Sequence, residues 1–252
     1  MNNKWFQISS VCSPFIAGLA LALSQLPPIS DWLPNRDLTI RHGSSVVIRG
    51  ELGIVGYDLL VDLQNTGNTT INVEQVKLII TSPDGAETIY PATHFFDEGS
   101  DRTYPIRQLN LEKGSRIATL MIFEKKIRPD LEEKINDVKV GVSQSTFHNR
   151  QNSPAEILTD SKWVAADSTY IEKANKLFEE NFDLKKGNYH LRLEVFSESS
   201  KIPFKIKSHS TVYDFHLRTI SSQVEEYRYG LGINAHMLSE KYISLDLEST
   251  KD

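Results

Sequence analysis

Hydrophobic and polar residues alternate over much of the chain after residue 37, which is the pattern of half-buried β-strands. Such strands, separated by turns rich in Gly, Pro and Asn, predict a mainly β fold with an antiparallel sheet. The segments with this pattern are 38–41, 45–49, 57–64, 71–80, 87–90, 117–123, 138–142, 189–196, 204–207 and 212–217.

The connections between the first strands carry recognisable turn residues. Residues 65–68, Asn-Thr-Gly-Asn, join two alternating segments, and residues 83–85, Pro-Asp-Gly, follow the second of them. The phase of the apolar positions changes between Val73 and Val76, which predicts a β-bulge near residues 74–75.

Residues 57–85 resemble the immunoglobulin-like sandwich modules of bacterial surface and envelope proteins. The resemblance rests on a strand ending in Asn-x-Gly-Asn, a second strand and a Pro-Asp-Gly turn. Residues 182–196 are similar to the late strands of immunoglobulin-like or fibronectin-like sandwiches. The resemblance implies an antiparallel immunoglobulin-like sandwich, elaborated or tandem, with an adhesive or spacer role and no catalytic residue to transfer.

A helical pattern interrupts the strands at residues 170–180, where apolar residues recur at helical spacing after a capping-box sequence. We expect one short amphipathic helix there. The domain organisation predicted is a β-sandwich over 37–145 and either a second sandwich or the completion of the first over 155–247. The charge-rich residues 123–137 indicate a loop or short helix, and 144–154 indicate a boundary or long loop.

The first 30 residues differ from the rest because no charged residue lies between Trp5 and Ser30. This segment predicts an N-terminal hydrophobic helix that is either a secretory signal peptide or a membrane anchor, crossing the membrane through residues 5–26 if it is not cleaved. The residues that carry this prediction are Phe15, Ile16, Leu19, Leu21 and Leu23.

The charges around this segment leave two localisations open. Its length and small residues favour export to the periplasm or cell surface, by a cleaved signal or an anchor. Only Lys4 precedes it, whereas Arg36, Arg41 and Arg49 follow, and this bias favours an anchor whose body faces the cytoplasm.

Composition restricts the chemistry of the folded part. The formal charge of −5, from 28 basic and 33 acidic residues, disfavours nucleic-acid binding. The single cysteine, Cys12, lies in the N-terminal segment, so the body has no thiol for a disulfide, a metal cluster or a nucleophile. An exported domain without disulfides favours a bacterial source.

No catalytic or cofactor motif was found. Asp97, Glu98 and Asp101 form a weak candidate for a calcium site, because hard cations bind several oxygens from one loop. We therefore expect a protein-binding or structural module without a cofactor, whose partner is another protein or an envelope component. The alternatives are a membrane-anchored effector or sensor, and an enzyme with scattered site residues such as His94, Asp97 and Asp101.

Overall fold

The structure is a computed structural model, and it describes residues 34–97, 100, 102–151, 164–198, 200–229 and 242–249. Antiparallel strands dominate this part of the chain, as the sequence predicts. The strands are β1 (Leu38–Glu51), β2 (Ile54–Asn65), β3 (Ile71–Thr81), β4 (Glu87–Asp97), β5 (Arg102–Pro105), β6 (Leu109–Leu111), β7 (Arg116–Glu124), β8 (Gly187–Ser197), β9 (Ser200–Val212), β10 (Ile243–Asp246) and β11 (Glu248–Ser249).

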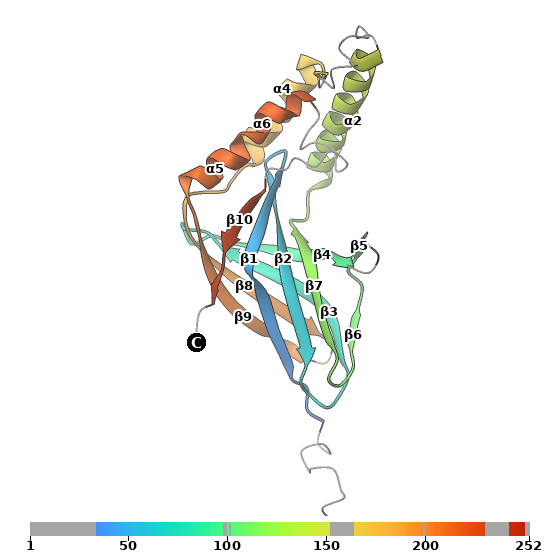
Figure 1. Cartoon of the computed structure of the whole chain (residues 1–252), viewed down its shortest axis with the longest axis vertical. Helices are drawn as coiled ribbons and strands as arrows, with labels where there is room; N and C mark the ends of the chain where they lie inside the picture. The colour runs from blue at the N-terminus through green and yellow to red at the C-terminus, as the bar shows by residue number, and fades with distance from the viewer. Residues whose placement is uncertain are drawn as a thin grey trace, which may run out of the picture.

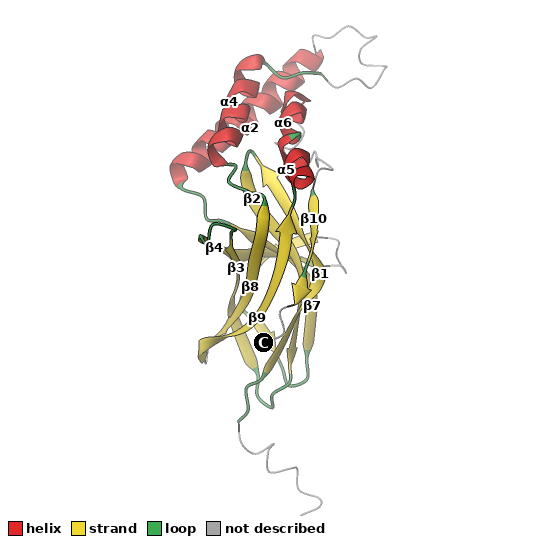
Figure 2. Ribbon diagram, turned by 90° about the vertical axis from the view of Figure 1, so that its left-hand side faces the viewer, coloured by secondary structure: helices red, strands yellow, loops and turns green. Residues whose placement is uncertain are grey.

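Helices gather at one end of the strands (Figures 1 and 2). The hydrophobic helix expected from Phe15 to Leu23 lies outside the described residues. Within them, no helix combines the length and apolar character that a membrane crossing requires. The helical elements are α2 (Pro129–Gln151), α4 (Ser168–Asn181), α5 (Asp214–Ser221), α6 (Gln223–Glu226) and the 3-10 turn η2 (Tyr227–Tyr229).

The strands form one nearly closed, barrel-like sheet in the order β10-β1-β2-β7-β4-β3-β8-β9-β11. Strands from both halves of the sequence lie in it, because β8 pairs with β3. The C-terminal segment 243–249 joins the two ends of this order: its first part, β10, pairs with β1 and its last part, β11, pairs with β9. We call this junction the C-terminal seam.

A second junction lies within β4, which changes its partner among the long strands along its length and also pairs with the short strand β5. Residues 87–91 pair with β3, whereas residues 92–95 pair with β7. A register shift between Ala92 and His94 accompanies the change of partner. A bulge bends a strand, and β4 therefore turns from one side of the barrel-like sheet to the other.

The core follows from the alternation in sequence. Leu59, Val61 and Leu63 of β2 are buried, while the intervening Leu60 is 43% exposed. The predicted bulge near residues 74–75 is confirmed, because the ladder between β3 and β8 shifts register between Val73 and Gln75.

Helix α2 corrects the strand predicted at residues 138–142. Val138 and Val142 are buried, but Val140 between them is 52% exposed, so the apparent alternation does not describe one face of a strand. The buried positions Ile135, Val138 and Val142 follow one another at three and four residues, which is helical spacing. Helix α2 also agrees with the helical alternative of the loop or short helix predicted over 123–137, and it replaces most of the boundary or long loop predicted over 144–154.

The helix predicted at 170–180 is confirmed as α4, which packs against α2. A Cβ atom added to Gly141 of α2 would lie 2.0 Å from the ring of Tyr170 of α4. Glycine therefore lets the two helices approach closely. Lys173 strengthens the contact, since its ammonium lies 2.8 Å from the carboxylate of Asp137.

The β1–β2 hairpin connects the sheet to these helices. Leu52 and Gly53 at its tip have positive φ angles of 48° and 82°, as a tight hairpin turn requires. Leu52 is fully buried, and a Cβ on Gly53 would lie 2.5 Å from the carbonyl oxygen of Phe178. The hairpin tip is thus embedded in the helical layer.

Asn65, a fully buried polar residue, lies at the end of the sheet away from the helices. Its side-chain amide donates to the carbonyl oxygens of Thr69 at 2.8 Å and Leu111 at 2.9 Å, and its side-chain oxygen accepts from the amide of Gly67 at 2.9 Å. The predicted Asn-Thr-Gly-Asn turn therefore also joins neighbouring segments by hydrogen bonds.

Candidate functional site at the C-terminal seam

The acidic residues singled out in the sequence are only partly described. Asp97 ends β4 and accepts a hydrogen bond from the hydroxyl of Ser100 at 2.9 Å, while Glu98 and Asp101 lie outside the described residues. His94 is three residues before Asp97 on the same strand, so the two side chains point to opposite faces. Among the described residues, no group of three metal-ligating side chains was found, and the calcium site stays a prediction.

The candidate site lies where the C-terminal seam opens toward the helices. The β9–β11 ladder comprises two residue pairs, Ser208 with Ser249 and His209 with Glu248. Beyond His209, β9 continues to Val212, whereas the C-terminal segment turns away to pair with β1. The two strand edges diverge, and in this stretch the hydroxyl of Ser210 donates to the carbonyl oxygen of Asp246 at 2.7 Å.

A hollow of about 380 Å³ lies between the diverging edges, and we call it the seam groove. Two exposed aromatic side chains, Tyr213 and Phe215, line it. Their rings stack with centroids 5.8 Å apart and an interplanar angle of 9°. Tyr242, the residue before β10, is also exposed, at 60%, but it is not among the residues that line the groove.

The start of α5 fixes the position of these rings. The backbone amide of Tyr213 donates to Nδ1 of His216 at 3.1 Å, as part of a capping box. Burial lowers the pKa of His216, which keeps the ring neutral and Nδ1 available as an acceptor near neutral pH. The ring of His216 lies 3.9 Å from that of Phe215, between centroids.

This arrangement corrects the strand predicted at residues 212–217. The strand ends at Val212, and α5 begins at Asp214, an acidic residue suited to the first turn of a helix. His216 and Ile220, four residues apart, are its buried positions. The chain therefore turns at Tyr213, and the aromatic residues lie on a helix start instead of alternating along a strand.

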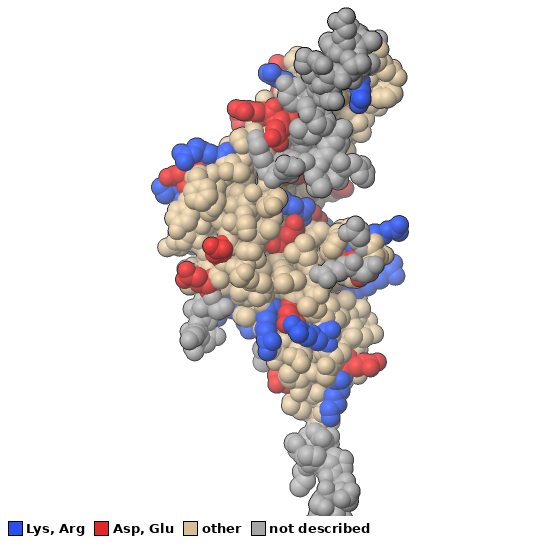
Figure 3. Space-filling model, in the orientation of Figure 1, with Lys and Arg blue, Asp and Glu red and all other residues tan. Residues whose placement is uncertain are grey.

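The charges around the seam groove are mainly acidic. Asp246 and Glu248 are exposed on its C-terminal side, and Glu248 lies 2.9 Å from Nε2 of His209. Asp214 is paired with Lys186 at 2.6 Å. Figure 3 shows a broad area without Lys, Arg, Asp or Glu around β10, with acidic groups beside it and basic groups along its α5 side.

The seam groove combines three features that suit an extended peptide. It has diverging strand edges whose backbone groups can pair with another strand, stacked aromatic rings and neighbouring carboxylates. Backbone pairing supplies affinity in strand addition, while side-chain pockets supply specificity. The arrangement is chemically suited to holding an extended segment that carries an aromatic or basic side chain.

Comparison with protein-family models, curated proteins and solved structures gave no match to this chain. The candidate site is therefore identified from the geometry of its residues.

Proposed function

We propose that this chain is a non-enzymatic binding module that holds another protein at the seam groove. The observation that carries the proposal is the stacked, exposed pair Tyr213 and Phe215 beside a hollow between diverging strand edges. Exposed aromatic residues are enriched at protein interfaces, because a large ring is buried at little cost in conformational entropy.

The partner segment we propose is an extended peptide with a basic residue near an aromatic or aliphatic one. Its backbone pairs with the edge of β9 beyond His209. Its cation faces Asp246 and Glu248, and its apolar side chain covers the ring of Phe215. A strongly acidic peptide is disfavoured, since like charges would meet along the C-terminal segment.

The proposal includes a membrane-associated or exported location, as in the envelope modules that residues 57–85 resemble. The proposal also includes a relationship to immunoglobulin-like modules, which the antiparallel fold supports. The uncharged segment before residue 30 supports the location. β1 starts at the end of the sheet opposite the helices (Figure 1), so an anchor preceding it would hold that end and leave the helical end accessible.

Photo-crosslinking in the native host tests the binding proposal. A photoreactive amino acid replaces Phe215 in one variant and Ile89 in a control, since both side chains are 54% exposed and only Phe215 lines the seam groove. We expect a discrete crosslinked protein from position 215 and none from position 89. The same products from both positions would contradict a specific site.

Intact-mass measurement on fractionated cells tests the location. Loss of about 22 to 24 residues indicates a cleaved signal, and a full-length mass in the membrane fraction indicates an anchor. Protease treatment of spheroplasts then distinguishes an exported body, which is digested, from a cytoplasmic-facing effector or sensor, which is protected. A full-length protein in the soluble cytoplasmic fraction would contradict both the cleaved signal and the anchor.

A further inference from the structure

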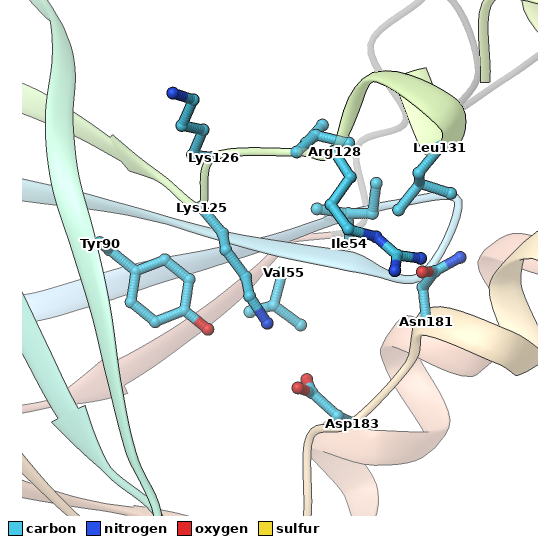
Figure 4. A pocket seen from close by; sticks show the side chains of 10 residues that line it. Ile54, Val55, Tyr90, Lys125, Lys126, Arg128, Leu131, Asn181 and Asp183 are labelled. Carbon is cyan, nitrogen blue, oxygen red and sulfur yellow. The ribbon is translucent and has the colours of Figure 1, made fainter. Parts of the chain in front are cut away.

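A second hollow lies at the junction between the barrel-like sheet and the helices, and it shares no residue with the seam groove. Its volume is about 300 Å³, which is at the lower end of small-molecule sites. Its walls come from β2, β4, the β7–α2 connection, the first turn of α2, and the end of α4 with the segment that follows it. Ile54, Val55 and Leu131 form its apolar part (Figure 4).

Polar groups of opposite charge enter this cavity from different elements. Figure 4 shows the ammonium of Lys125, from the β7–α2 connection, and the carboxylate of Asp183, from the segment after α4, both directed into it. The hydroxyl of Tyr90, from β4, points toward the same space. The side-chain amide of Asn181 lies on the side of Arg128.

These charges do not neutralise each other directly. Both residues belong to the described part of the chain, and there no ion pair joins Lys125 to Asp183. Burial, together with the negative charge of Asp183, raises the pKa of Tyr90 to about 12, so its hydroxyl stays protonated near neutral pH. The cavity therefore presents a cation, a carboxylate and a neutral hydroxyl around one space.

Simple ions fit this arrangement poorly. A plain carboxylate would pair with Lys125 but would be repelled by Asp183, and a plain amine would meet the reverse problem. A molecule with a carboxylate and an adjacent hydrogen-bond donor satisfies both groups at once. Arg128, whose guanidinium lies 3.4 Å from the carboxylate of Asp130, adds positive charge at the rim.

We propose that this cavity binds a small carboxylate whose α-carbon also carries an ammonium or hydroxyl group and whose side chain is apolar. The carboxylate pairs with Lys125, the α-donor bonds to Asp183, and the side chain contacts Ile54, Val55 and Leu131. The α-amino acids and the α-hydroxy acids share this chemistry. This site is independent of the seam groove, so either proposal can fail without the other.

The neighbouring lysines supply a matched control. Lys125 and Lys126 are adjacent in sequence and both are exposed. Both line the cavity, but Figure 4 shows the ammonium of Lys125 directed toward Asp183 and that of Lys126 pointing away from Asp183 and Tyr90. Lys125→Gln and Lys126→Gln remove the same charge from nearly the same place, and only the first removes a contact to the ligand.

Calorimetric titration of the full chain with three molecules of equal shape tests the class of ligand. L-leucine carries an α-ammonium, 2-hydroxy-4-methylpentanoate carries an α-hydroxyl, and 4-methylpentanoate carries neither. We expect at least one of the first two to bind, about tenfold or more tightly than the third, because Asp183 otherwise faces an anion without a donor. Whichever of the first two molecules binds more tightly shows whether the ligand is an α-amino acid or an α-hydroxy acid.

The variants complete the test, with a thermal unfolding curve confirming that each one folds. Lys125→Gln weakens binding about tenfold or more, Lys126→Gln changes it less than about twofold, and Asp183→Asn reduces the preference over 4-methylpentanoate. Equal effects of the two lysine substitutions would overturn the proposal. So would absence of binding by both donor-bearing acids up to about 10 mM, or equal binding of all three.

Discussion

The two ends of the barrel-like sheet are closed by different chemistry. At the end where β1 begins, the buried side chain of Asn65 makes three hydrogen bonds to backbone groups of neighbouring segments. At the helical end, the buried side chain of Leu52 on the β1–β2 hairpin lies within the helical layer instead. One end is held by directional polar bonds, and the other by apolar packing.

This difference has a consequence for function. At the helical end, segments from different parts of the chain pack side by side, and their side chains do not fill every space between them. The seam groove adjoins α5. The second hollow, which we call the junction cavity, adjoins α2 and α4.

Leu52→Ala gives the largest expected effect on the free energy of unfolding. It removes a fully buried side chain and leaves a cavity, which costs about 3 kcal/mol. Urea unfolding measures this loss. The control is Leu60→Ala on β2, where the side chain is 43% exposed and the cost is below about 1 kcal/mol. Similar losses in the two variants would contradict the burial of the hairpin tip.

Asn65→Ala tests the other end, and we expect a loss of about 2 kcal/mol in the free energy of unfolding. The substitution leaves two carbonyl oxygens and one amide without their buried partner. Hydrogen exchange should show the lost protection at the β2–β3 turn, while the helices keep theirs. Asn72→Ala is the control, because its amide pairs with Glu198 at an exposed site, and its cost is below about 1 kcal/mol.

Acidification should weaken the start of α5 by less than about 1 kcal/mol. The pKa of His216 is lowered in the folded chain, so the unfolded chain binds more protons below about pH 6.5. Stability therefore falls as the pH drops through that value toward the folded-state pKa, where Nδ1 gains a proton and stops accepting from Tyr213.

Urea midpoints at about pH 7.5 and about pH 5.5 measure this loss. His216→Gln provides the comparison, since glutamine does not titrate. The wild-type chain should lose more stability between the two pH values than the variant. An equal loss in both would assign the pH dependence to other groups.

Local sequence patterns predicted much of the sheet. The alternation over 57–64 and 71–80 corresponds to β2 and β3, and the change of phase after Val73 marks a real irregularity in the ladder. These features depend on neighbours a few residues away, and this is why the pattern reports them. The helix over 170–180 was predictable for the same reason, because its apolar stripe is local, although the predicted capping box is not the cap: α4 begins after Asp167, whose side chain makes no capping hydrogen bond.

Residues 138–142 of α2 and residues 214–217 of α5 were predicted as strands, because over a few residues an alternating pattern and a helical pattern look alike. Val138, Val140 and Val142 alternate like a strand, and only the longer spacing that includes Ile135 indicates a helix. The pattern at 212–217 has the same ambiguity. Acidic residues in the first turns, Asp130 and Asp214, were the signals that could have distinguished them.

The candidate sites could not be predicted from the sequence because they join distant segments. The seam groove places residues 209–216 beside 244–248, and the junction cavity places Tyr90 near Lys125 and Asp183. In neither site do the residues follow one another in the sequence at the spacing of a known motif. Exposed aromatic residues such as Phe215 look like core residues until the fold shows which side of the chain they occupy.

The most direct test of the central claim is crosslinking from Ser244, an exposed residue that lines the seam groove. A photoreactive amino acid at this position is compared in the wild-type chain and in the double variant Tyr213→Ala, Phe215→Ala. We expect the crosslinked partner to disappear in the double variant while the thermal unfolding midpoint is unchanged. Persistence of the same crosslinked partner at full yield would contradict binding through the aromatic pair.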